Sequence, residues 1–172
     1  MTKFQQMATA TISALALLAG ASAASAQSWG FNQAAGTPVT ATGQLNQNVL
    51  VGGVIPTKCN VTISGVVGPN GNSIIFNSYV GTQVPGDGGN LACGDSLFFP
   101  ITATATGSNE INLDEFEVGT RGGPCYEADY KLAYAGNVAT FNGVPFGSPP
   151  ICIATGNIAL TANGSAVNIV AK

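Results

Sequence analysis

Apolar residues recur at every second position in several short stretches of the chain, and the two clearest stretches each begin at a cysteine. A period of two is typical of a strand with one buried face. An Asn-Gly pair, which favours a tight reversal, follows Cys59 and Cys152 at the same distance, so the sequence predicts two β-hairpins. The alternating small or apolar residues are Val61, Ile63, Gly65, Val67, Ile74 and Phe76 in the first hairpin, and Ala154, Gly156, Ile158, Leu160, Val167 and Ile169 in the second.

Further strands are predicted between these hairpins. Residues 97–105 form one strand, in which Pro100 indicates a sheet edge or a bulge. A second strand follows Cys125 and has two distinct faces. One face carries Tyr126, Ala128, Tyr130, Leu132 and Tyr134, and the other carries Glu127, Asp129 and Lys131.

The same patterning excludes a helical domain. No stretch of ten or more residues after position 26 keeps the apolar stripe of an amphipathic helix. Short strands separated by Gly, Pro or Asn-Gly turns are typical of antiparallel all-β proteins. We therefore predict an antiparallel β-sandwich or jelly-roll-like single domain over residues 53–172, with two disulfides.

Residues 1–26 have the pattern of a secretory signal peptide. Lys3 is their only charge, an uncharged apolar run follows, and Ala24-Ser25-Ala26 has the small-x-small form of a cleavage site. The run is too short and too weakly apolar to predict a membrane anchor. We therefore expect a secreted or cell-surface location and no transmembrane segment in the mature chain.

Residues 27–52 are predicted to be a low-charge N-terminal extension, rich in Ala, Gly, Thr, Gln and Asn. One interpretation is a leader followed by the first strand of the domain. The other is a segment that pairs with the sheet edge of a neighbouring copy.

Four cysteines, in a chain that we expect to be exported, predict two disulfides. Of the three pairings, we favour Cys59 with Cys93 and Cys125 with Cys152, because each closes a loop of moderate length around neighbouring strands. A zinc site would need all four as widely spaced thiolates, since the chain has no Cys-x-x-Cys pair and no histidine. No metal and no cofactor is therefore predicted.

Charge is scarce and mostly negative. After loss of residues 1–26, four basic side chains remain against eight acidic ones. This balance disfavours nucleic acid and anionic membranes as partners. Only 8% of residues are charged, against about 25% in a typical domain. Such a chain suits contact with cell-surface or matrix components, or with copies of itself.

Histidine, the residue that enzymes use most often as a base, is absent, and the acidic residues form no obvious catalytic pair. Without histidine the common Ser and Cys triads are excluded, and disulfides would remove the thiols. Glu115, Glu117, Glu127 and Asp129 offer acid pairs for glycoside cleavage, but no pair stands out. We therefore predict no catalytic residues and a protein that is not an enzyme.

Two clusters are candidates for binding. Glu110, Asp114, Glu115 and Glu117 are able to attract Ca²⁺, but their spacing is not that of an EF-hand, and alternation places Asp114 on the face opposite Glu115 and Glu117. We favour a solvated strand face and leave Ca²⁺ binding open. Tyr126, Tyr130 and Tyr134 would form a ligand-stacking platform if exposed, although tyrosines in such a row more often line a core edge.

The motifs around the cysteines resemble those of the protein activators of alkane oxidation, the PraB-like family of small exported bacterial proteins. The matching segments are Ile55–Gly65, Leu91–Gly94, Leu97–Ala103, Gly123–Cys125 and the Cys152 hairpin. The resemblance covers about residues 53–172. It implies a secreted or surface-bound, non-enzymatic protein that acts at interfaces, in growth on hydrocarbons or in biofilm adhesion.

The sequence and the resemblance therefore support three candidate functions. The first is an adhesion or surface-active protein that contacts hydrocarbon or biofilm components. The second is a pilus-like subunit that polymerises by strand exchange of residues 27–52. The third is a module that binds a small apolar or sugar ligand.

Overall fold

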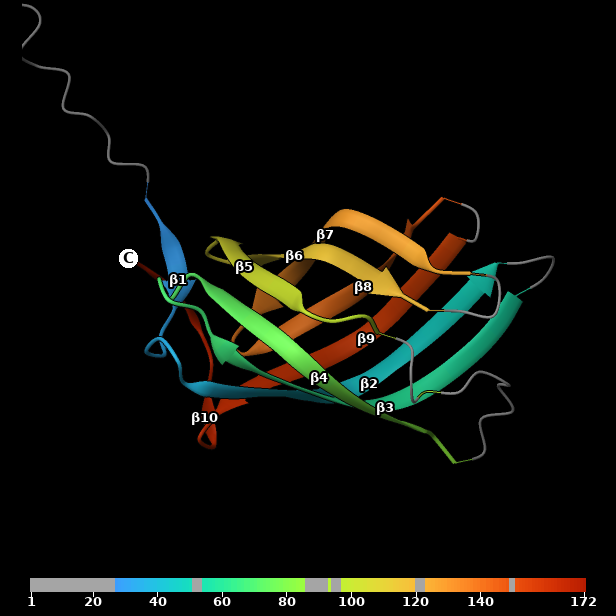
Figure 1. The fold of residues 1–172 in the computed structure, drawn as a ribbon, viewed down its shortest axis with the longest axis horizontal. Helices are drawn as coiled ribbons and strands as arrows, with labels where there is room; N and C mark the ends of the chain where they lie inside the picture. The colour runs from blue at the N-terminus through green and yellow to red at the C-terminus, as the bar shows by residue number, and fades with distance from the viewer. Residues whose placement is uncertain (1–26, 51–53, 86–92, 94–96, 120–122, 149–150) are drawn as a thin grey trace, which may run out of the picture.

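The computed structural model describes residues 27–50, 54–85, 93, 97–119, 123–148 and 151–172, and every regular element in these ranges is a β-strand (Figure 1). All strand pairings are antiparallel, so the all-β antiparallel prediction is confirmed. The strands are β1 (Trp29–Phe31), β2 (Pro38–Leu50), β3 (Val54–Val67), β4 (Ser73–Gln83), β5 (Ile101–Gly107), β6 (Glu110–Val118), β7 (Cys125–Ala135), β8 (Val138–Phe146), β9 (Ile151–Ala162), β10 (Ser165–Ala166) and β11 (Ile169–Ala171).

Strands β2 to β9 form one sheet that closes into an eight-stranded barrel. Each strand pairs with the next in sequence, and β9 then pairs with β2, with Gly156 opposite Leu45. The predicted sandwich or jelly-roll is therefore wrong. Inward and outward residues alternate in the same way along the strands of a sandwich and of a barrel. The difference lies in the contact between β2 and β9, which are distant in sequence.

Two glycines let the closing strands approach each other. A Cβ atom on Gly43 would lie 2.0 Å from the carbonyl oxygen of Asn157, and one on Gly156 would lie 2.1 Å from that of Gln44. Any larger residue would push β2 and β9 apart. The close contact that completes the barrel therefore depends on glycine at these two positions.

The barrel has an apolar interior and a polar exterior. Val39, Ala41 and Leu45 alternate inward along β2 and are almost fully buried. On the outside, uncharged polar side chains meet across neighbouring strands. Gln44 Nε2 donates to Asn60 Oδ1 at 3.0 Å, and Thr140 Oγ1 donates to Asn157 Oδ1 at 3.0 Å.

Both predicted hairpins are present. The first joins β3 to β4 and reverses at Gly71, which has a φ of 67°. The second joins β9 to β10 at Asn163 and Gly164, whose φ values of 50° and 77° are those expected of a tight hairpin turn. The second hairpin has a short return strand, because β11 pairs with β1 instead of continuing along β9.

The two ends of the barrel differ. The β1–β11 ribbon lies at one end, at the left of Figure 1, where the fully buried Phe31 ring meets Tyr134 edge-on at a centroid distance of 6.4 Å. We call this the ribbon end. At the other end β6 and β8 finish and β7 and β9 begin. A disulfide joins these two starts, so we call it the disulfide end.

The favoured cysteine pairing is confirmed. Cys59 is bonded to Cys93, and Cys125 is bonded to Cys152. The first bridge ties β3 to the segment between β4 and β5. The second links β7 to β9 across the end of β8, since Cys152 is paired with Phe146 in the sheet.

The predicted extension, residues 27–52, contains β1 and β2, and both belong to the fold. β2 is hydrogen-bonded to β3 on one side and to β9 on the other. A strand that is paired on both sides within its own chain has no edge to offer a neighbouring copy. The β-fold therefore includes strands that lie well before residue 53.

The predicted signal peptide, residues 1–26, lies outside the described residues. Within the part of the chain that the structure describes, there is no helix of the length and hydrophobicity needed to span a membrane.

Candidate functional site

Among the described residues, only apolar side chains line a small cavity inside the barrel. Its volume is about 40 Å³, and each of the eight barrel strands contributes at least one lining residue. Leu113, Leu132 and Phe141 are among them, and all are buried. Apolar cavities of this kind stay dry and accept apolar guests in preference to water. In its present shape the space holds only a few carbon atoms.

A larger groove opens on the surface where β7 and β8 separate. The β7–β8 ladder holds only three residue pairs, from Ala133 opposite Thr140 to Ala135 opposite Val138. Toward the disulfide end β7 stays paired with β6, and β8 stays paired with β9. The groove has a volume of about 600 Å³, and its lining includes Tyr130, Leu132, Val144 and Pro145. We call it the β7–β8 groove.

Tyr130 forms the aromatic floor of this groove. Its ring belongs to a buried cluster with Phe116, Phe141 and Phe146, at centroid distances of 5.0 to 6.0 Å from Tyr130. Its hydroxyl donates to the carbonyl oxygen of Val144 at 3.3 Å, a contact that crosses from β7 to β8. Burial, and to a lesser extent the Glu127 carboxylate, raises the pKa of Tyr130 above its ordinary value of 10.0.

The three tyrosines proposed as a stacking platform do not share an exposed surface. Tyr130 and Tyr134 are buried in the core, whereas Tyr126 is 48% exposed on the outer face. The predicted single face is interrupted, since Leu113 and Phe116 of the neighbouring β6 both point inward although they are three residues apart. Glu115, between them, has a φ of 54°, which shifts the alternation.

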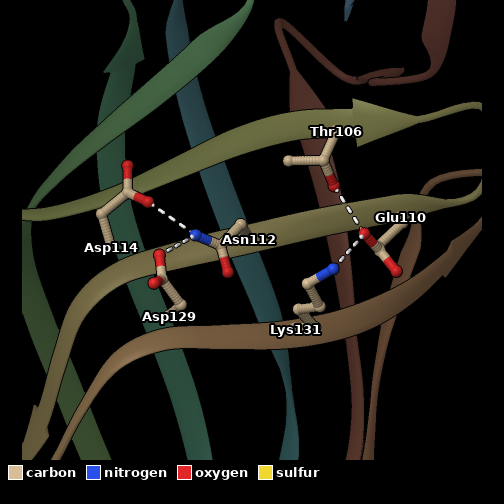
Figure 2. Close-up of polar contacts among 6 residues, drawn as sticks. All are labelled: Thr106, Glu110, Asn112, Asp114, Asp129 and Lys131. Carbon is tan, nitrogen blue, oxygen red and sulfur yellow. Dashed lines mark hydrogen bonds and ion pairs between the residues drawn. The ribbon is translucent and has the colours of Figure 1, made fainter.

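Polar side chains line up along the outer face of β5, β6 and β7 (Figure 2). At one end of this row, Glu110 Oε1 accepts a hydrogen bond from Thr106 Oγ1 at 2.8 Å and lies 3.3 Å from Lys131 Nζ. The Thr106 hydroxyl, followed by the Lys131 ammonium, lowers the pKa of Glu110 below its ordinary value. Because these groups are solvent-exposed, the pair adds little to stability.

At the other end of the row, Asn112 separates two carboxylates. Its Nδ2 donates to Asp114 Oδ1 at 2.7 Å and to Asp129 Oδ1 at 2.9 Å, and Figure 2 shows both oxygens pointing at this nitrogen. The amide therefore offsets the repulsion between two acids that face each other across β6 and β7.

The acidic cluster is arranged differently from the prediction. Asp114 shares the outer face of β6 with Asn112, since the two side chains are hydrogen-bonded. The four acids thus do not divide between faces as strict alternation requires. Among the described residues, no three acid, histidine or cysteine side chains stand close enough to hold a metal ion.

Large apolar side chains are exposed at the disulfide end. Phe98 donates its backbone N–H to the Glu117 carbonyl oxygen at 3.2 Å, and Tyr126 is paired with Glu117 across the sheet, so the backbones of both residues lie next to Glu117. Val144 and Ile151 lie at the same end of the barrel. The four are 51%, 48%, 50% and 37% exposed respectively. Sequence reasoning missed this group, which we call the disulfide-end apolar group, because its members come from four separate segments.

Comparisons with known proteins place the chain in one family. A family model described as alkane oxidation protein activator PraA/PraB-like matches residues 1–168, which is nearly the whole chain. No curated protein and no solved structure matches the chain.

Proposed function

The chain belongs to the alkane oxidation protein activator PraA/PraB-like family, and from this premise we propose that it is an exported, non-enzymatic protein that contacts hydrocarbon at interfaces. Two disulfides support export, because such bonds persist in oxidising compartments. Its partners are then hydrocarbon surfaces and cell-surface or matrix components.

The observation that carries this proposal is the disulfide-end apolar group. Several exposed apolar side chains at one end of the barrel, on a surface with few charges, support contact with another apolar phase or partner. Such side chains gain about 25 cal/mol for each Å² that leaves water. A barrel held by two disulfides gives these side chains a stable support.

The experiment measures the tension of a hexadecane–water interface by pendant drop, together with attachment of the producing cells to hexadecane droplets. We expect the wild-type protein to lower the tension and the variant Phe98→Ser/Tyr126→Ser to lose most of that effect. Val170→Ser is the matched control, because Val170 is an exposed apolar residue on β11 at the ribbon end. A wild-type protein without effect on tension or attachment would refute the proposal.

A further inference from the structure

The β7–β8 groove leads toward the interior of the barrel. β7 is eleven residues long, from Cys125 to Ala135, yet only Ala133 to Ala135 pair with β8. Over the rest of its length β7 contacts β8 through Tyr130, whose hydroxyl donates to the Val144 carbonyl and whose ring packs against Phe141 and Phe146. The wall of the barrel therefore lacks a backbone ladder at this groove and is held there by side chains.

One buried side chain stands between the groove and the cavity. Leu132 lines both spaces and is only 2% exposed. A change of its rotamer would join the groove, of about 600 Å³, to the apolar cavity of about 40 Å³. The combined space falls in the range of about 300 to 1,000 Å³ that is usual for small-molecule sites.

The charges around the groove select against an anionic guest. Glu110, Glu127 and Asp129 line it, and among the described residues that line it Lys131 is the one cation. The Lys131 ammonium is already paired with Glu110 at 3.3 Å. A carboxylate head group would thus meet net repulsion, whereas a hydroxyl group is able to donate a hydrogen bond to Glu127 or Asp129.

We infer that an unbranched, uncharged hydrocarbon chain, an alkane or a primary alcohol, enters the barrel between β7 and β8. The chain lies over Tyr130 and Leu132, and its end displaces Leu132 and occupies the internal cavity. The inference rests on the proposed function for the chemical class of the ligand. The proposed function concerns contact at the outer surface, whereas this inference assigns a binding site inside the barrel.

The test uses the exported, disulfide-bonded protein and three ten-carbon probes: decane, 1-decanol and decanoate. Side-chain chemical shifts are followed by NMR during titration. We expect decane and 1-decanol to shift the Leu132 methyl and Tyr130 ring signals, with the Val170 methyls at the ribbon end as an internal control. Decanoate should bind about fivefold more weakly than 1-decanol at low ionic strength, with a smaller gap at high salt.

Variants then separate the interior from the outer groove. Leu132→Ala enlarges the path and should raise the affinity about fourfold for each methylene that it newly admits. Ala139→Leu fills the cavity and should lower the affinity by a similar factor. Glu127→Gln should strengthen decanoate binding and leave 1-decanol unchanged. Glu117→Gln is its matched control, because Glu117 does not line the groove.

Each outcome bears on the inference. Shifts of Leu132 that respond to both cavity variants support it. Shifts confined to Phe98 and Tyr126 overturn it and leave the proposed function standing. No shift with any probe overturns the inference, and the tension and attachment measurements then decide the proposed function separately. If either variant fails to fold, the map of shifts on the wild-type protein still decides between the groove and the outer surface.

Discussion

Replacing Cys125 and Cys152 by alanine removes the covalent link between the starts of β7 and β9. The bridge closes a loop of 27 residues. The lost restriction of the unfolded chain corresponds to about 3.5 kcal/mol of unfolding free energy. Both cysteines are buried, and alanine keeps the small size of the side chain, so the loss of the bond dominates.

The pair Cys59 and Cys93 supplies the matched control. Its sequence separation is 34, which predicts a loss of about 3.8 kcal/mol, nearly the same as for the other bridge. The two double variants should therefore lose similar global stability. They should differ locally, because the first half of β7 has a ladder with β6 but none with β8, and the Cys125–Cys152 bridge is its covalent link on the β8 side.

Urea unfolding measures the global loss, and native-state hydrogen exchange measures the local one. We expect the amides of residues 127–131 to exchange faster in Cys125→Ala/Cys152→Ala than in Cys59→Ala/Cys93→Ala. A loss below about 1 kcal/mol for either variant would contradict the chain-entropy argument. Equal exchange of residues 127–131 in both variants would contradict the role given to the Cys125–Cys152 bridge in holding this part of β7.

Three further predictions concern the polar groups. Tyr134→Phe removes the hydrogen bond to the Val167 carbonyl, 2.5 Å long and buried, and should cost about 1 to 3 kcal/mol in urea unfolding; an unchanged midpoint would show that the bond contributes nothing. The pKa of Glu110, followed by carboxyl NMR, should rise more in Thr106→Val than in Lys131→Met, because the Thr106 hydroxyl is the larger cause of its lowering; the reverse order would refute this ranking. Burial raises the pKa values of Tyr130 and Tyr134 in the folded state, so their stabilising effect is complete below the unfolded value of 10.0 and is lost as the pH rises through the folded values. Unfolding free energy that stays constant above pH 10 would contradict that burial.

Short sequence motifs indicate the family, whereas the proposed binding site depends on the tertiary structure. Motifs around the cysteines already indicate the family, because they are short and local. The β7–β8 groove arises from strands that begin together as a hairpin and then follow different neighbours. Such a separation has no local sequence signal, since the residues that line it alternate like those of any strand.

By itself the sequence determined the local structure of this protein: strands from the period of two, turns from Asn-Gly pairs, and the two disulfides from cysteines that close moderate loops. Each of these depends on neighbouring residues in the chain. Only the tertiary structure decided that the sheet closes into a barrel, because closure requires β2 and β9 to meet at Gly43 and Gly156. It also decided which tyrosines are buried, because Tyr130 and Tyr134 pack in the core with aromatic rings of other segments whereas Tyr126 stays exposed. Packing between segments that are distant in sequence decides both barrel closure and tyrosine burial. The alternation of residues along a single strand predicts neither.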